Sequence, residues 1–195
     1  MVVRDPEDVS RYDEELGKVT IGGARPLERP IEIRAYDPRW PLHYEREEAR
    51  IRSVLGDRVL RLEHVGSTAV PGLPAKPVID IALEVEESAA EPAYVPALEA
   101  AGFLLRIWEP EWYEHRLLKR QDTEVNLHVF PANCPEVDRM LRFRDRLRGN
   151  AADRELYTDA KRKLAARKWK YMQQYADAKT EVIREIIARA EAAAG

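Results

Sequence analysis

The chain has 195 residues, of which 45% are hydrophobic and 34% charged, so it is long enough for one domain with a buried core and an appendage. It contains no run of about 18 apolar residues and no apolar N-terminal stretch, so we expect neither a transmembrane helix nor a signal peptide. The single cysteine, Cys134, excludes an internal disulfide framework, and these features together predict a cytoplasmic protein.

The net charge of −3 hides an uneven distribution of charge along the chain. Residues 1–138 carry 17 Lys and Arg against 27 Asp and Glu, whereas residues 139–170 carry 12 against 4. A basic segment after an acidic body attracts phosphate groups, although a solvated helix face explains the same charges. Nucleic-acid binding is disfavoured because aromatic and basic residues do not interleave on the expected strands.

The elements are expected in a mixed α and β order. Residues 1–30 contain Pro and Gly-Gly, which predicts an extension that drapes over the domain or stays mobile. Pro41 favours the start of a helix and Gly56 its end. Hydrophobic periodicity predicts strands at residues 31–35, 58–65, 78–85, 103–107, 114–119 and 124–130, and further helices at 91–101, 136–148, 153–165 and 168–193.

Two of these strands carry polar residues on an otherwise apolar pattern. The run from Val78 to Leu83 is mostly apolar and suggests a central strand, so Asp80 within it needs a partner. Between residues 124 and 130, Glu124, Asn126 and His128 share one face because strand side chains alternate. We therefore expect Asp80 and His128 on one face of adjacent strands, where an imidazole is able to ligate a metal or act as a general base.

The most informative segment is residues 64–81, which read His-Val-Gly-Ser-Thr-Ala-Val-Pro-Gly-Leu-Pro-Ala-Lys-Pro-Val-Ile-Asp-Ile. A strand ends at Val65, and Gly66-Ser67 makes a tight turn whose backbone is able to approach a ligand closely. Lys76 adds a positive charge, and Asp80 offers hard oxygen atoms for a metal such as magnesium. This arrangement suits a nucleoside triphosphate.

This segment resembles the GrpB family signature, His-Ile/Val-Gly-Ser-Thr-x-Val-Pro-Gly-Leu-x-x-Lys-Pro-x-Ile-Asp-Ile. The resemblance continues in Tyr36-Asp37-Pro38-x-Trp40-Pro41, Asn126-Leu127-His128-Val129 and Phe143-Arg144-Asp145-x-Leu147-Arg148. That family is grouped with the nucleotidyltransferase superfamily. The resemblance implies an α/β (α+β) fold, in which a small mixed sheet with flanking helices occupies residues 31–135 and a helical region follows at residues 136–195.

The resemblance also implies a function and a site. We expect Mg²⁺-dependent transfer of a nucleotidyl group from a triphosphate, ATP first, to a small-molecule acceptor, including ligase-type activation of a carboxylate. The expected catalytic residues are Asp80, His128 and Lys76, and the expected metal ligands are Asp80, Glu124 and His128. The triphosphate is expected to contact Gly66, Ser67, Thr68, Lys76, Arg144 and Arg148.

One departure from the superfamily favours an alternative function. Ala82 stands where the superfamily has a second carboxylate, and Glu84 lies roughly 13 Å along the strand from Asp80, too far to share an ion. The alternative is a catalytically inactive module that binds a nucleotide or metabolite and regulates a partner. Several single residues also have a structural explanation that requires no function. These are a structural ion pair for Lys76 and Asp80, core packing for His64, and a surface position for His115, Lys161 and Lys179.

Overall fold

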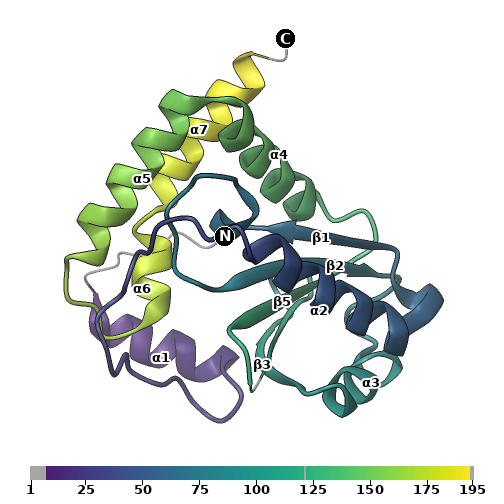
Figure 1. The fold of residues 1–195 in the computed structure, drawn as a ribbon. Helices are drawn as coiled ribbons and strands as arrows, with labels where there is room; N and C mark the ends of the chain where they lie inside the picture. Colours follow the sequence, from purple (N-terminus) through teal and green to yellow (C-terminus); the bar gives the residue numbers. More distant parts are fainter. Residues whose placement is uncertain (1–7, 121, 194–195) are drawn as a thin grey trace.

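A five-stranded mixed sheet forms the centre of the protein (Figure 1). The computed structural model describes residues 8–120 and 122–193. The strands lie in the order β1-β2-β5-β4-β3; β2 and β5 run parallel, and the other three neighbouring pairs are antiparallel. Their bounds are Arg61–Val65 (β1), Ile79–Val85 (β2), Phe103–Glu109 (β3), His115–Arg120 (β4) and Val125–Pro131 (β5). The expected mixed sheet with flanking helices is confirmed.

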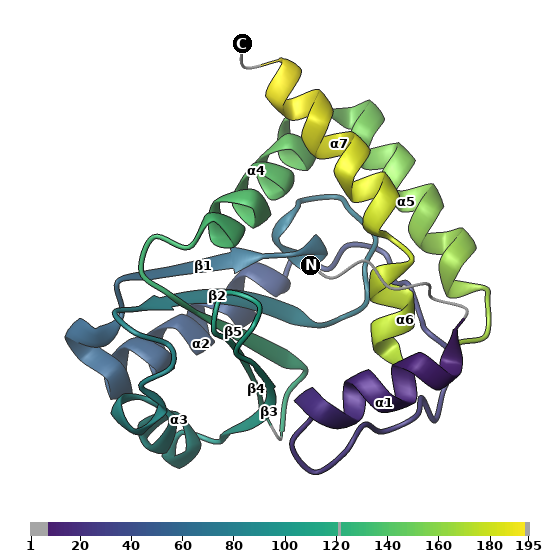
Figure 2. The same cartoon turned by 180° about the vertical axis from the view of Figure 1, so that it is seen from behind.

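Helices cover both faces of this sheet (Figures 1 and 2). On one face, α2 (Trp40–Leu55) and α3 (Val95–Ala100) pack against the larger apolar core, to which β2 contributes Ile79, Ile81 and Leu83. On the other face, α4 (Pro135–Gly149) packs against Ala82 of β2. The remaining helices are α1 (Val9–Val19), α5 (Ala151–Ala165), α6 (Met172–Asp177) and α7 (Thr180–Ala192). No helix among the described residues is long and apolar enough to span a bilayer.

The alternation along β2 explains how an acidic residue enters a central strand. The odd-numbered residues from Ile79 to Val85 face the apolar core under α2 and α3. The even-numbered residues Asp80, Ala82 and Glu84 face the opposite side, because successive side chains of a strand alternate. Ala82 and Glu84 are buried on that side, while Asp80 stays partly exposed at the end of the strand nearest the helical region.

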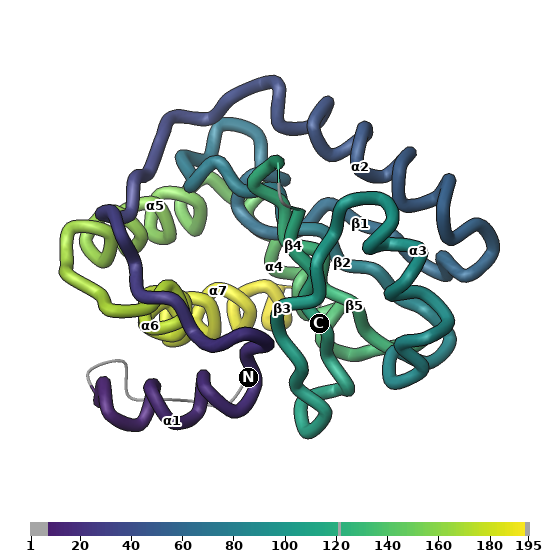
Figure 3. Tube along the Cα trace, turned by 90° about the horizontal axis from the view of Figure 1, so that it is seen from below, coloured from purple at the N-terminus to yellow at the C-terminus, as the bar shows by residue number. Residues whose placement is uncertain are grey.

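The N-terminal segment contains a helix that the sequence pattern did not predict. Within the described part of residues 1–30, α1 forms and packs through Tyr12 and Leu16 against Tyr171, which precedes α6. The segment after α1 pairs with the sheet edge through Thr20 and Ile107 and then runs past α6 (Figure 3). This segment therefore connects the outer strand β3 to the C-terminal helices.

Two other expected elements were wrong. Residues 31–35 form no strand, and only Arg34 makes an isolated bridge, to Ala75. The long helix expected at 168–193 is divided into α6 and α7. Its first residues are not helical because the Gln174 side chain accepts hydrogen bonds from the backbone N–H groups of Lys170 and Tyr171 and so starts α6 at Met172.

Candidate functional site

The Gly66 turn passes directly over Asp80. Gly66 follows β1 with φ +71°, a value that L side chains rarely adopt. A Cβ atom on Gly66 would lie 2.6 Å from Asp80 Oδ2, closer than a carbon atom tolerates. Glycine is therefore required here both for the backbone conformation and for the close approach to the carboxylate.

Thr68 holds the Gly66 turn in place, and it does not line the cavity between the sheet, this turn and α6. Its hydroxyl donates a hydrogen bond to the carbonyl of Val78 at 3.0 Å. Since that hydroxyl proton is used, its oxygen accepts from His64 Nε2, also at 3.0 Å. The His64 ring stacks on Tyr44 on the α2 side of the sheet, and burial lowers the pKa of His64 to about 4. Thr68 and His64 thus tie the turn to the core, and packing is the observed role of His64.

We expect Gly66→Ala to destabilise the protein by about 2–4 kcal/mol, because the new methyl group meets Asp80 in a backbone region that only glycine adopts easily. Urea unfolding followed by circular dichroism measures this loss. Gly72→Ala is the matched control, because Gly72 has φ +77° but open space around its Cβ position. Equal losses in the two variants would contradict the close approach, and adding Asp80→Ala should relieve part of the loss in Gly66→Ala alone.

Three polar side chains stand side by side on β2 and β5. Asn126 Nδ2 donates a hydrogen bond of 2.8 Å to Asp80 Oδ1, and His128 Nε2 lies 3.9 Å from the same oxygen. The expectation that Asp80 and His128 share one face of adjacent strands is therefore confirmed. Burial opposes ionisation of Asp80, but His128 in its protonated form, the amide of Asn126 and the positive charge of Lys76 outweigh it and hold the pKa of this carboxyl below its ordinary value.

Behind His128, a second histidine continues the row of polar groups. His115 Nε2 lies 3.1 Å from His128 Nδ1, and His115 Nδ1 lies 2.8 Å from Glu109 Oε2. His115 is only 3% exposed, and this burial lowers its pKa to about 4. A hydrogen-bonded chain thus runs from the outer strand β3 through β4 to His128 on β5.

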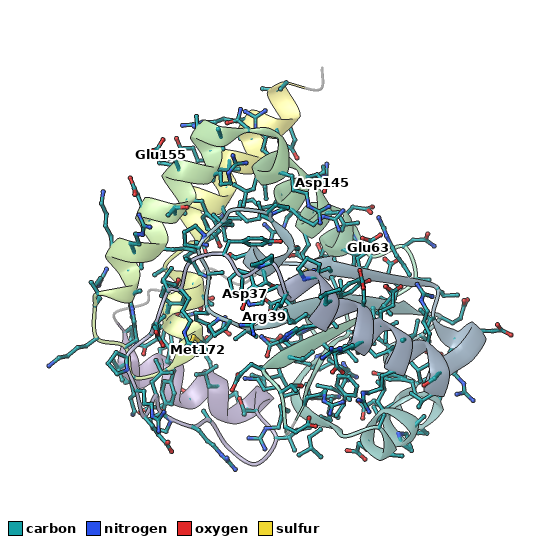
Figure 4. The ribbon with its side chains drawn as sticks, viewed as in Figure 1. Asp37, Arg39, Glu63, Asp145, Glu155 and Met172 are labelled. Atoms are coloured by element: carbon teal, nitrogen blue, oxygen red, sulfur yellow. The ribbon has the colours of Figure 1, made fainter. Side chains whose placement is uncertain are left out.

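Three lysine side chains face this row from the loop and the C-terminal helices. Lys161 of α5 is 2% exposed and donates hydrogen bonds to the carbonyl of Pro74 and, at 3.2 Å, to Ser67 Oγ. Lys76 donates to the Met172 sulfur at 2.9 Å (Met172 is labelled in Figure 4). Lys179 lies over the ring of Tyr175 at 4.6 Å.

Burial is the main cause of a lowered pKa in all three lysines, and the neighbouring charge of Lys179 adds to it at the other two. The pKa of Lys76 falls to about 8 and that of Lys161 to about 7, and the pKa of Lys179 is also lowered. Among the described residues, no ion pair joins Lys76 to Asp80, so the alternative of a closed structural pair does not hold for these two side chains. The amino groups are held by neutral partners instead.

The three lysines line one cavity of about 340 Å³ together with Asp80. The cavity lies between the sheet, the Gly66 turn and α6. Within the described part of the chain, its charged lining consists of five basic side chains and one carboxylate: Arg25, Lys76, Lys119, Lys161, Lys179 and Asp80. Ser67 and the polar pair Asn126 and His128 also line it, and Leu16, Ile107 and Leu117 make it apolar on the side of α1 and β3. A cavity with this excess of positive charge is suited to a ligand with several negative charges.

The structure does not bring two expected phosphate ligands, Arg144 and Arg148, to this cavity. Arg144 donates hydrogen bonds to Glu63, at 2.8 Å, and to Asp145 (both labelled in Figure 4), and Arg148 donates to the carbonyl of Ala69. Their guanidinium groups already have acceptors on the β1 side of the protein. Neither arginine lines the cavity that holds Asp80, because α4 presents this face to β1 and to the loop after it.

Glu124, an expected metal ligand, also lies elsewhere. It precedes β5, its side chain is exposed, and it lines a different cavity with Arg34 and Arg120. Only its backbone carbonyl reaches β2, where it accepts from the N–H of Ile79. Glu84 is excluded as a replacement, because its carboxylate accepts a hydrogen bond of 2.9 Å from the N–H of Cys134 at the start of α4. No carboxylate other than Asp80 lines the cavity among the described residues.

Some residues of the site were not predicted. Lys119 lies on β4 opposite Asn126 of β5, and the two-residue spacing that puts it on one face with Leu117 and His115 was the available signal. Glu109 and Arg25 carried no signal, since their positions depend on the β3–β4 pairing and on the path of the N-terminal segment.

With this geometry in place, comparison with known proteins identifies the family. Residues 30–189 match the family model described as GrpB protein. The chain belongs to the GrpB family. Its GrpB relatives include the UPF0157 protein BH1888 of Halalkalibacterium halodurans, which is 56% identical over 93% of this chain and 93% of its own length. The UPF0157 protein SCO7215 of Streptomyces coelicolor is 44% identical over 89% of this chain and 90% of its own.

The GrpB fold is also present in a solved structure. The crystal structure of the conserved protein GrpB from Enterococcus faecalis is 29% identical to this chain, with a TM-score of 0.69. The match covers 82% of this chain and 96% of that one, so the two GrpB proteins share most of their architecture.

Proposed function

We propose that the cavity binds a nucleoside triphosphate and transfers its nucleotidyl group to a small-molecule acceptor. The observation that carries this proposal is the charge of the lining, in which five cationic side chains surround the single carboxylate of Asp80. A triphosphate supplies the negative charge that this lining lacks. ATP is the first triphosphate to test.

The phosphate groups would contact Ser67, Lys76, Lys161 and Lys179, which converge on the cavity from four different segments. Among the described residues, the amino groups of Lys76 and Lys161 contact sulfur, hydroxyl or carbonyl acceptors and no carboxylate, so no bound anion compensates their charge when they are protonated. A buried cation without an anion is unfavourable, so an anionic ligand would gain free energy by pairing with it. Gly66 contributes by bringing the turn close to Asp80.

The residues present accommodate a magnesium ion only together with substrate phosphates. Among the described residues, no cluster of three or more His, Cys, Asp and Glu side chains is able to hold a metal. Mg²⁺ is commonly bound by one or two carboxylates plus substrate phosphate oxygens, and Asp80 offers one such carboxylate. An ion held there would neutralise charge on the phosphates during displacement.

His128 is the residue placed to handle the proton of the acceptor. Its Nε2 faces Asp80 and the cavity, and its side chain is partly exposed. In the proposed reaction an acceptor oxygen or nitrogen forms a bond to the α-phosphorus, the bond from that phosphorus to the bridging oxygen breaks, and pyrophosphate leaves. His128 would take the proton released from the acceptor.

The second candidate is a binding module that holds a nucleotide or acidic metabolite without turnover and regulates a partner. Ala82 favours it, because this buried residue pairs with His128 at the position where the superfamily places its second carboxylate. The two candidates share the ligand site and differ in the chemistry that follows binding.

A thermal-shift panel of ATP, GTP, CTP and UTP, each with and without Mg²⁺, tests the shared site. A ligand at 100 times its dissociation constant should add about 2.7 kcal/mol of stability. We expect at least one triphosphate to raise the melting temperature, and Lys76→Ala and Ser67→Ala to reduce the rise. Unchanged melting temperatures with all four triphosphates would argue against nucleotidyl transfer and against a nucleotide-binding module, whereas stabilisation without pyrophosphate release from any acceptor would favour the binding module.

A further inference from the structure

His115 lies behind His128 in the row of polar side chains. It is not part of the cavity lining, and its ring stacks on Phe130 at 4.8 Å and meets Trp112 edge-on at 4.9 Å. The loss of hydration among these apolar neighbours disfavours an imidazolium ion by more than the Glu109 carboxylate favours it, so the pKa of His115 is lowered. His115 is therefore neutral and carries one ring proton.

Hydrogen bonding determines which nitrogen of His115 carries that proton. Glu109 Oε2 lies 2.8 Å from His115 Nδ1, and an ionised carboxylate only accepts hydrogen bonds, so Nδ1 is the protonated nitrogen. His115 Nε2 is then an acceptor, and the partner 3.1 Å away, His128 Nδ1, must donate to it. In a neutral His128 this leaves Nε2 without a proton.

We propose that His115, held by Glu109, is a positioning residue that keeps His128 in the Nδ1–H tautomer and presents its unprotonated Nε2 to the cavity beside Asp80. The use of that nitrogen as a base rests on the proposed function, whereas the tautomer itself does not. A free neutral imidazole prefers its proton on Nε2, so the chain from Glu109 reverses the ordinary preference.

The contact with Asp80 agrees with this assignment. His128 Nε2 and Asp80 Oδ1 lie 3.9 Å apart, beyond hydrogen-bond distance, and Asp80 Oδ1 instead accepts from Asn126 at 2.8 Å. Two acceptors that face one another keep such a separation, while a proton on Nε2 would favour a shorter contact. The same lone pair is what an acceptor hydroxyl or amine needs in order to lose its proton.

Long-range ¹H–¹⁵N correlation spectra of the ¹⁵N-labelled protein test the tautomer without any substrate. The chain has four histidines, and the His128 signals are assigned as those missing in His128→Gln. We expect Nδ1–H to be the main form at pH 7.5, because the hydrogen bond to His115, worth roughly five- to tenfold, outweighs the preference of a free imidazole for Nε2–H. A wild-type spectrum with Nε2–H as the main form overturns the proposal, whether or not any variant folds.

Three variants separate positioning from packing. In His115→Phe, which retains an aromatic ring but no acceptor, Nε2–H should become the main form of His128. His115→Gln provides an amide oxygen and should restore part of the Nδ1–H form. His64→Phe is the matched control, because His64 is also buried but lies on the other face of the sheet against Tyr44, and it should leave the His128 tautomer unchanged. An Nδ1–H majority that survives in His115→Phe would contradict the role of His115.

Kinetics then distinguish this proposal from the proposed function. Where pyrophosphate release is measurable, His115→Phe should lower kcat by the same factor as the measured fall in the Nδ1–H fraction of His128 and leave KM for the triphosphate within about twofold. A protein with the Nδ1–H tautomer that binds no triphosphate would support the positioning and contradict the function. A protein that binds the triphosphate but holds His128 as Nε2–H would support triphosphate binding and contradict the positioning role of His115.

Discussion

An Asp80→Asn variant is expected to keep its fold and to lose metal-dependent pyrophosphate release by at least about a hundredfold. The amide has the shape of the carboxylate, and its oxygen is able to keep the hydrogen bond from Asn126 Nδ2. The substitution removes the one carboxylate that lines the cavity among the described residues, and with it the protein ligand that Asp80 would offer a magnesium ion there. Purified protein assayed with ATP and candidate acceptors measures the loss, and thermal melting measures the fold.

A structural role for Asp80 predicts a different result for the same variant. Breaking a closed, buried ion pair costs about 3–5 kcal/mol, because a charge stays behind without a partner. No such pair joins Asp80 to Lys76 among the described residues, since the amino group of Lys76 donates to Met172, so we expect a smaller loss than that. Asp145→Asn is the control, because this acid on α4 pairs with Arg144 outside the cavity. A loss of 3 kcal/mol or more in Asp80→Asn, combined with a wild type that releases no pyrophosphate, would favour the binding module.

The polar face of the sheet was predictable because its polar residues stand at regular positions in otherwise apolar strands. The alternation of Asn126 and His128 with apolar neighbours, and one acid in the apolar run around Asp80, were enough to place both on the same face. Glycine at position 66 was predictable as a close approach, but its contact was not, since the clash is with a side chain 14 residues further along the chain.

The partners of the positive charges were not predictable from the sequence. Arg144 and Lys161 both follow the GrpB signature in a basic helical region, and sequence spacing favoured the arginines as phosphate ligands. In the fold, Arg144 meets Glu63, a residue 81 positions away, while Lys161 reaches the Gly66 turn without meeting an acid. Whether a cation is already neutralised depends on helix packing, which short-range patterns do not encode.

The Lys161→Met variant is expected to change how stability and ligand binding depend on pH. The pKa of Lys161 is about 7 in the folded protein and near 10.5 when unfolded, so between these values the unfolded chain binds more protons. The destabilising effect of the buried charge is fully present below pH 7 and is relieved as the pH rises. Wild-type stability should therefore increase by up to about 1.4 kcal/mol per pH unit between pH 7 and 9 from this group, and Lys161→Met should lose that increase. Urea unfolding at successive pH values measures it, with exposed Lys163→Met as the control.

Triphosphate binding next to Lys161 is expected to be coupled to proton uptake. At pH 8 the amino group of Lys161 is mostly neutral in the free protein, because its pKa has fallen to about 7. Phosphate oxygens placed beside it would raise that pKa, so binding should take up close to one proton at this position. Calorimetry in two buffers that differ in ionisation enthalpy measures the uptake, which should fall by most of one proton in Lys161→Met and stay unchanged in Lys163→Met. Equal uptake in the wild type and Lys161→Met would mean that the phosphates lie elsewhere in the cavity, because a neutral amine within reach of a triphosphate has to gain its proton.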